Sequence, residues 1–77
     1  MEEILGMVKL FAGNFAPLGF MKCDGQTLSI SQNQALFSIL GTTYGGNGTV
    51  NFVLPKLSAP EGMSYVICVA GIYPQRP

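Results

Sequence analysis

The segment CDGQTLSISQNQALFSILGTTYGGNG, residues 23–48, carries the signals that decide the fold. It opens with Asp24-Gly25, a dipeptide typical of two-residue hairpin turns. We therefore predict a hairpin with short strands over 20–23 and 26–28.

The middle of this segment predicts one short helix over 32–40. Ser31 is a favourable N-cap residue, and Gln34 completes the S-x-x-Q pattern of a capping box. Gly41 suits the left-handed position that ends a helix. The apolar face of the helix, which we expect to lie in the core or at an interface, consists of Leu36, Phe37, Ile39 and Leu40.

The end of the segment is a glycine-rich loop. A nucleotide-binding P-loop needs a lysine after its glycines and then a helix, whereas here no lysine follows and the next residues suggest a strand. We predict a structural turn, in which backbone freedom is required at Gly41, Gly45, Gly46 and Gly48. The alternative is a polar loop that contacts sugars, with candidate ligand contacts at Tyr44, Asn47 and Asn51.

Outside this segment the pattern predicts further strands at 6–13, within 49–55 and at 64–70. The strand at 64–70 is apolar on both sides, so we expect it to be central or at an interface, through Tyr65, Val66, Ile67 and Val69. Together these elements predict a small α+β fold. A single domain would span 1–77, with a linker at 58–63 and a C-terminal strand region at 64–74.

The composition predicts an oligomer. The chain of 77 residues is 48% hydrophobic and only 10% charged, with a formal net charge of zero. A domain of this size buries only about 60% of its unfolded surface, which leaves too little interior for so many apolar side chains. Association with further copies would bury the rest.

The same composition argues against several functions. No basic excess is present for nucleic-acid binding, and the longest apolar run, 65–70, is too short to span a bilayer. The N-terminus starts with two acidic residues, so we expect no signal peptide.

Catalytic and cofactor chemistry is not expected either. The sequence contains no histidine, which excludes Ser-His-Asp and Cys-His arrangements within one chain. Its carboxylates are scattered, so we predict no enzyme activity, no metal site and no cofactor; they are Glu2, Glu3, Asp24 and Glu61.

Two cysteines, Cys23 and Cys68, leave two alternatives. They form either a disulfide that closes a loop of about 45 residues or two buried free thiols, and we favour free thiols. Lys22 beside Cys23 would lower the pKa of an accessible thiol, although burial would have the opposite effect.

Three motifs carry a resemblance to a known family. The segments LFAGNFAPLGF (10–20), the opening segment (23–48) and NFVLPKL (51–57) resemble successive motifs of the phage tail collar domain. The resemblance covers 6–57, and the end of the chain, MSYVICVAGIYPQRP, is similar to the end of longer members. Those members carry a long Gly/His-rich insertion between the two parts, and here SAPEG takes its place. Phe20, Lys56 and Ser58 stand where the family usually has tryptophan, aspartate and arginine.

The resemblance implies a structural module of a phage tail fibre that assembles as a homotrimer or docks on a larger assembly in the virion tail. Receptor-binding elements of such fibres lie in the inserted region, which is missing here. Two alternatives stay open. One is a receptor- or glycan-binding adhesion module that uses the 44–51 loop, and the other is an accessory subunit of a bacterial secretion, surface or injection machine at the cell surface.

Overall fold

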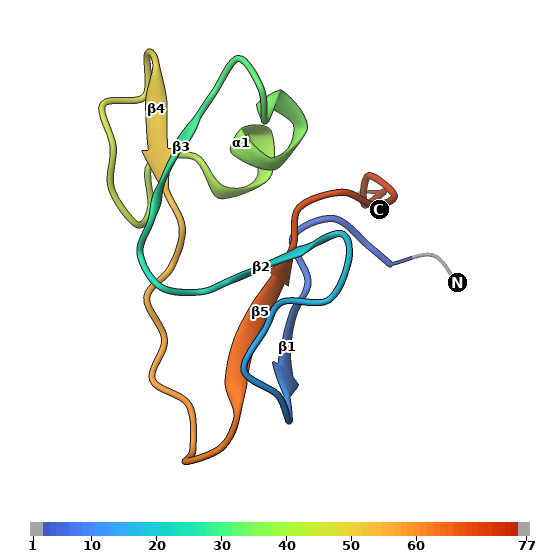
Figure 1. Ribbon diagram of the computed structural model, residues 1–77. Helices are drawn as coiled ribbons and strands as arrows, with labels where there is room; N and C mark the ends of the chain where they lie inside the picture. Colours follow the sequence, from blue (N-terminus) through green and yellow to red (C-terminus); the bar gives the residue numbers. More distant parts are fainter. Residues whose placement is uncertain (1–2, 76–77) are drawn as a thin grey trace.

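The computed structural model describes residues 3–75, with a radius of gyration of 12.3 Å. Its six elements, in chain order, are β1 (Val8–Phe11), β2 (Phe20–Lys22), β3 (Thr27–Ser29), α1 (Gln34–Leu40), β4 (Asn51–Val53) and β5 (Ser64–Cys68). Five short strands and one short helix confirm the predicted α+β class. The strands form two sheets at opposite ends of the molecule, and α1 lies beside the β3–β4 sheet (Figure 1).

The larger sheet has the strand order β1-β5-β2, with both pairings antiparallel. Ile67, the fourth of the five residues of β5, lies opposite Val8 on one side and Met21 on the other. Three consecutive residues of β5, which alternate between the two faces, are buried: Val66, Ile67 and Cys68. This confirms the prediction of a central strand that is covered on both faces.

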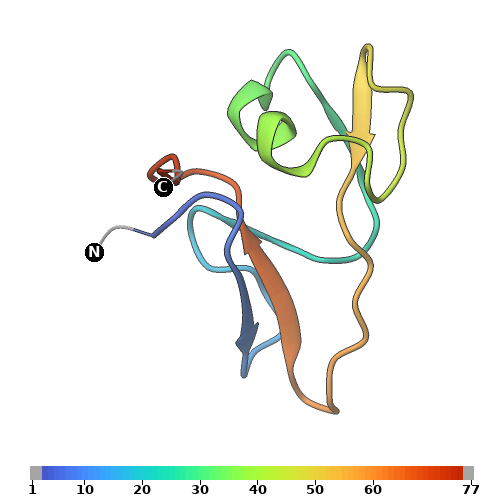
Figure 2. The same cartoon turned by 180° about the vertical axis from the view of Figure 1, so that it is seen from behind.

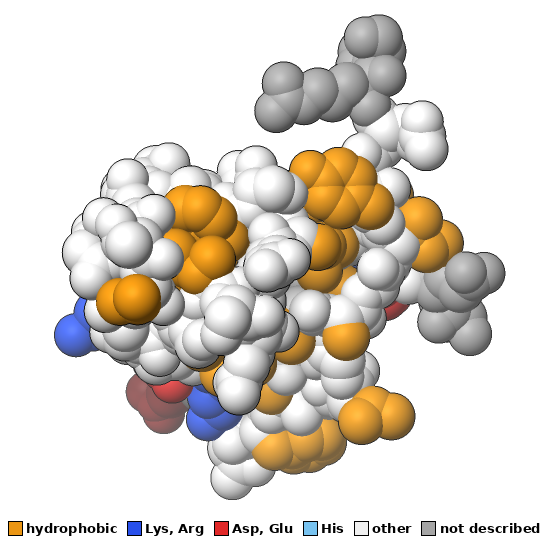
Figure 3. Space-filling model, turned by 90° about the horizontal axis from the view of Figure 1, so that it is seen from above, with side chains coloured by type: hydrophobic (Ala, Val, Ile, Leu, Met, Phe, Trp, Pro, Cys, Tyr) orange, Lys and Arg blue, Asp and Glu red, His pale blue; other side chains and the backbone are white. Residues whose placement is uncertain are grey.

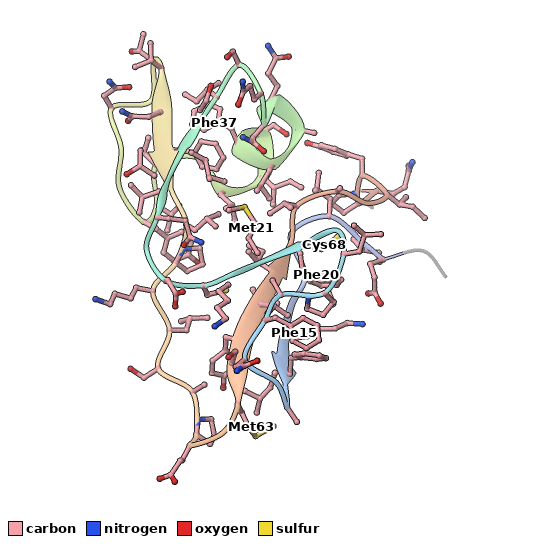
Figure 4. The ribbon with its side chains drawn as sticks, in the orientation of Figure 1. Phe15, Phe20, Met21, Phe37, Met63 and Cys68 are labelled. Atoms are coloured by element: carbon pink, nitrogen blue, oxygen red, sulfur yellow. The ribbon has the colours of Figure 1, made fainter. Side chains whose placement is uncertain are left out.

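The second sheet is the antiparallel pair β3–β4, in which Leu28 lies opposite Phe52. Helix α1 packs here, with Leu36 buried and the Phe37 ring 5.4 Å from the Phe52 ring, centroid to centroid. Figure 4 shows Phe37 in this half of the molecule and Met21 on β2 of the larger sheet, between that sheet and α1. One core joins the two halves through Leu5, Cys23, Leu36, Phe52, Leu54 and Ile67.

The predicted hairpin around Asp24-Gly25 is wrong. Strands β2 and β3 do flank this dipeptide, but β2 pairs with β5 and β3 pairs with β4. Between them the chain crosses from one sheet to the other. Gly25 has a φ of +77° and donates its N–H to the Pro55 carbonyl at 3.3 Å. Gly25 therefore lies in a connection between two strands and not in a hairpin turn, because this connection pairs with the 55–57 segment through the Asp24–Lys56 bridge and the Gly25 hydrogen bond.

The predicted start of the helix is also wrong. Helix α1 begins at Gln34 after Asn33, whose side chain makes no capping hydrogen bond to the helix. Asn33 instead donates from Nδ2 to the Ser29 carbonyl at 2.9 Å, while Ser31 Oγ bonds to Ser29 Oγ at 2.9 Å. The capping box is thus not formed, because Ser31 belongs to the turn that precedes the helix.

The first and last described segments lie on the same side of the molecule (Figure 2). Strand β5 stops at Cys68, short of the predicted 64–70, because the N–H groups of Val69 and Ala70 both bond to the Gly19 carbonyl. Beyond this point Ile72 forms a parallel bridge with Ile4. The first and last described segments thus close over one edge of the core.

Candidate functional site

The glycine loop between α1 and β4 is a turn whose backbone conformation requires glycine. The φ angles of Gly45, Gly46 and Gly48 are +128°, +99° and +75°. A Cβ atom on Gly46 would lie 2.5 Å from the Phe52 Cα and 2.8 Å from the Asn51 carbonyl oxygen. No other residue type fits this approach of the loop to β4, so the glycine serves the fold.

The end of the helix agrees with the predicted glycine stop. Gly41 has a φ of +58° and donates its N–H to the Phe37 carbonyl at 2.7 Å. Its ψ of −145° carries the chain away from the left-handed helical conformation and directly into the loop.

The asparagines proposed as ligand contacts hold the loop together. Asn47 Oδ1 accepts hydrogen bonds from the N–H groups of Thr49 and Val50 at 2.8 and 2.9 Å. It also accepts a longer bond, of 3.3 Å, from the N–H of Asn51. Asn51 Oδ1 in turn accepts from the Asn47 N–H at 2.9 Å. Tyr44 is half exposed, at 49%, and Asn47 is exposed as well, whereas Asn51 is partly buried.

The predicted interface residues lie in the chain's own core or against it. Leu36, Val66 and Ile67 are buried. The other five are partly buried and pack against the core: Phe37, Ile39, Leu40, Tyr65 and Val69. These side chains join β5 and α1 to the rest of the same chain, so whatever surface meets a partner includes other residues.

The exposed apolar residues lie elsewhere, and sequence reasoning did not single them out. Those of residues 3–75 that are large and at least 40% exposed are Ile4, Met7, Val8, Leu10, Phe15, Leu18, Tyr44, Val50, Leu57, Ile72 and Tyr73. On the face shown in Figure 3 such side chains surface in several patches and charged side chains are few. The signal in the sequence that could have indicated them is MVKLF, residues 7–11, in which apolar residues fall on both faces of a strand.

Both cysteines are buried free thiols. Burial is the main cause that raises the pKa of the Cys23 thiol above its ordinary value of 9.0, and the neighbouring Asp24 carboxylate adds to the effect. The neutral thiol is therefore favoured at Cys23, and the lowered pKa considered for a thiol beside Lys22 is not found.

The titratable groups do not assemble into a reactive site over residues 3–75. In this range no charged side chain is buried, and no group of three or more His, Cys, Asp or Glu residues is placed to hold a metal ion. The described part of the chain also contains no helix of the length and hydropathy needed to cross a bilayer.

The comparison with protein families gives one result. The model of the phage tail collar domain matches residues 6–60 of the 77-residue chain. Searches of curated proteins and of solved structures returned no match. The match includes β1 and β2 of the larger sheet, the helix, the glycine loop and the β3–β4 sheet. It agrees with the three sequence motifs. The chain belongs to the phage tail collar domain family, a structural family of phage tail fibres.

Proposed function

We propose that this collar chain is a non-enzymatic assembly module of a tail fibre that associates with copies of itself, as a homotrimer, or docks on a larger fibre. The observation that carries the proposal is its exposed apolar surface. Large hydrophobic side chains remain accessible on β1, in the loop after it and near both described ends. Such residues are normal when scattered singly, but here they accompany a surface with very few charges.

The size of the surface supports the same conclusion. The accessible area is 5139 Å², whereas a monomer of 8.2 kDa is expected to have about 4,500 Å². The radius of gyration of 12.3 Å likewise exceeds the value of about 11.5 Å expected for 77 residues. The two sheets lie end to end and share one narrow core, which leaves the chain with more surface than a fully compact domain.

Light scattering over a dilution series tests the proposal. A stable species near three times 8.2 kDa would support self-assembly into a trimer. Insoluble protein that is rescued by co-expression with a neighbouring tail gene product would support docking on a larger fibre. A soluble monomer at every concentration would contradict self-assembly and would assign the apolar surface to a partner. If co-expressed neighbouring tail gene products then failed to bind this monomer, docking on a larger fibre would be contradicted as well.

A receptor- or glycan-binding role for the 44–51 loop is the alternative. Its support is the half-exposed Tyr44 ring on a loop that Asn47 makes rigid. A loop whose backbone is already ordered loses little entropy on binding, which favours contact between Tyr44 and a sugar. A glycan array with the Tyr44→Ala variant as control tests this role, and the absence of any binder that depends on Tyr44 would reject it.

Whether the chain assembles in the virion tail or at the bacterial cell surface depends on the partner that it binds. Family membership implies the virion tail, and a neighbourhood of tail genes would agree with it. A neighbourhood of secretion or surface-adhesion genes would instead support an accessory subunit at the bacterial cell surface.

A further inference from the structure

The loop between α1 and β4 (Figure 1) contains a dipeptide that can react with itself, Asn47-Gly48. Asn47 is the only asparagine in the chain that is followed by glycine. Because glycine has no side chain, its backbone nitrogen can approach the preceding asparagine side chain closely. Asn47 is also exposed, so water reaches its amide. The dipeptide thus has the composition and the accessibility that spontaneous deamidation of asparagine requires.

Deamidation at this dipeptide needs no reagent other than water. The backbone nitrogen of Gly48 gives its proton to solvent and attacks Cγ of Asn47, and a bond forms between these two atoms. The bond from Cγ to Nδ2 then breaks, and the amide nitrogen leaves as ammonia after it takes up a proton from water. The product is a succinimide ring. Water opens this ring at either of its carbonyl carbons, which gives an aspartate or an isoaspartate.

In the folded protein both reacting groups are held by hydrogen bonds. The Gly48 N–H donates to the Asn51 carbonyl at 3.0 Å, which keeps the proton of the attacking nitrogen away from solvent. The Asn47 side chain is fixed at Oδ1 by the N–H groups of Thr49 and Val50, at 2.8 and 2.9 Å. The attack requires this side chain to turn toward Gly48. Both sets of bonds therefore have to open before Cγ and the nitrogen can meet.

An aspartate at position 47 fits the same loop. Asn47 Oδ1 only accepts, from three N–H groups, and Nδ2 donates no hydrogen bond within residues 3–75. A carboxylate oxygen accepts the same bonds, and its charge strengthens them. The loop segment 41–51 contains no charged side chain that would repel it. An isoaspartate, by contrast, adds a methylene group to the backbone and moves the N–H groups out of position.

We propose that Asn47 is a site of spontaneous deamidation, which the closed loop slows, which proceeds when the loop opens, and whose aspartate product the fold accepts. The inference does not depend on self-assembly, because every bond that it uses lies within one chain. Each event replaces a neutral amide by a carboxylate, so a chain of zero formal net charge gains one negative charge. The chemistry thus gives the 44–51 loop a second, charged form.

Peptide mass spectrometry of the wild-type protein, incubated folded and in urea at the same neutral pH, tests the control by the loop. Deamidation at Asn47 should be at least about tenfold slower in the folded protein, which corresponds to about 1.4 kcal/mol for opening the loop. A peptide of sequence 44–51 in the same solutions corrects for the effect of urea on the reaction. If the folded protein reacted as fast or faster, the N–H groups at Oδ1 would assist the reaction, and the proposal would be overturned.

A loosened loop gives the second test, with a matched control. Asn51→Ala removes the Oδ1 atom that accepts from the Asn47 N–H, and it should raise the rate in the folded protein about two- to tenfold, the effect of one hydrogen bond on the opening equilibrium. Asn14→Ala makes the same substitution at an exposed asparagine outside the loop and should leave the rate unchanged. Circular dichroism checks that both variants fold. Equal rates in the two folded variants would show that the loop bonds do not control the reaction.

The acceptance of the product is tested separately, with variants that do not depend on the reaction. Asn47→Asp reproduces the aspartate form, and its urea midpoint should equal or exceed that of the wild type. Asn47→Ala removes the acceptor and should lower the midpoint. If Asn47→Asp lowered the midpoint as much as Asn47→Ala, the loop would not accept the carboxylate, and this part of the proposal would be wrong.

Discussion

Gly46 shows how one residue fixes the loop that joins the helix to β4. Its positive φ is unfavourable for any residue with a Cβ, and the missing Cβ leaves room for the backbone of Phe52 and Asn51. We expect Gly46→Ala to lower the free energy of unfolding by about 3 kcal/mol or more, since backbone strain and a backbone clash add.

Gly62→Ala is the matched control for this prediction. Gly62 also has a positive φ, of +80°, but a Cβ there meets no atom within 4 Å. Its substitution should cost only about 1 kcal/mol, for the strain alone. Urea unfolding measures both variants, and equal losses would show that the loop moves aside and that the close approach is not required.

Cys23 gives a prediction about pH. Burial and Asp24 raise the pKa of its thiol in the folded protein above the ordinary value of 9.0. The neutral thiol is favoured in the folded state, so its contribution to stability is complete below pH 9 and is lost as the pH rises through the folded pKa. The free energy of unfolding should therefore fall above about pH 9.

The Cys23→Ala variant isolates this effect, because it removes the Cys23 thiol and leaves every other side chain in place. Its free energy of unfolding should fall less steeply between pH 8 and pH 10.5 than that of the wild type. Parallel curves from urea unfolding across this range would show that the Cys23 thiol makes no contribution.

At the scale of elements, helix α1 depends on what it packs against. With seven residues and no side-chain cap, it is too short to be stable alone. The buried Phe52 ring of β4 supports it through the contact with Phe37. We expect Phe52→Ala to cost about 3–5 kcal/mol and to lower the helical content of the protein, because the cavity opens directly under α1.

Phe15→Ala is the control, since Phe15 is 59% exposed and lies in the loop after β1. It should cost less than about 1.5 kcal/mol, the upper value for an aromatic pair such as the one it makes with Phe11. Circular dichroism and urea unfolding measure both variants. If both substitutions lowered the free energy of unfolding equally, the core around Phe52 would not be the main support of the helix.

At the scale of the whole molecule, the pairing of strands is distant in sequence. Strand β1 lies against β5, so Val8 meets Ile67 only after almost the whole chain has been brought together. Folds dominated by such non-local pairs refold in milliseconds to seconds. The chain must lose the conformational entropy of loop closure before the stabilising contacts form. Stopped-flow refolding from urea, followed by circular dichroism, should give rates in that range, and refolding within microseconds would contradict this topology.

The sequence by itself determined the class of fold, the central strand, the glycine stop of the helix and the family. These features depend on local patterns: an apolar run covered on both faces, a glycine at a helix end, and motifs read residue by residue. The same local patterns predicted the glycines of the 44–48 loop, whose positive φ values need no long-range contact to be foreseen.

The tertiary structure decided what the strands pair with and which apolar residues stay outside. Asp24-Gly25 favours a hairpin locally, but hydrogen bonds to the 55–57 segment separate β2 from β3. Val8 and Leu10 have the same apolar character as Val66 and Ile67, yet β1 takes the margin of the sheet and β5 the centre. Strand order is a long-range property, because it depends on which edges the rest of the chain covers, and hydrophobicity along the sequence does not specify it.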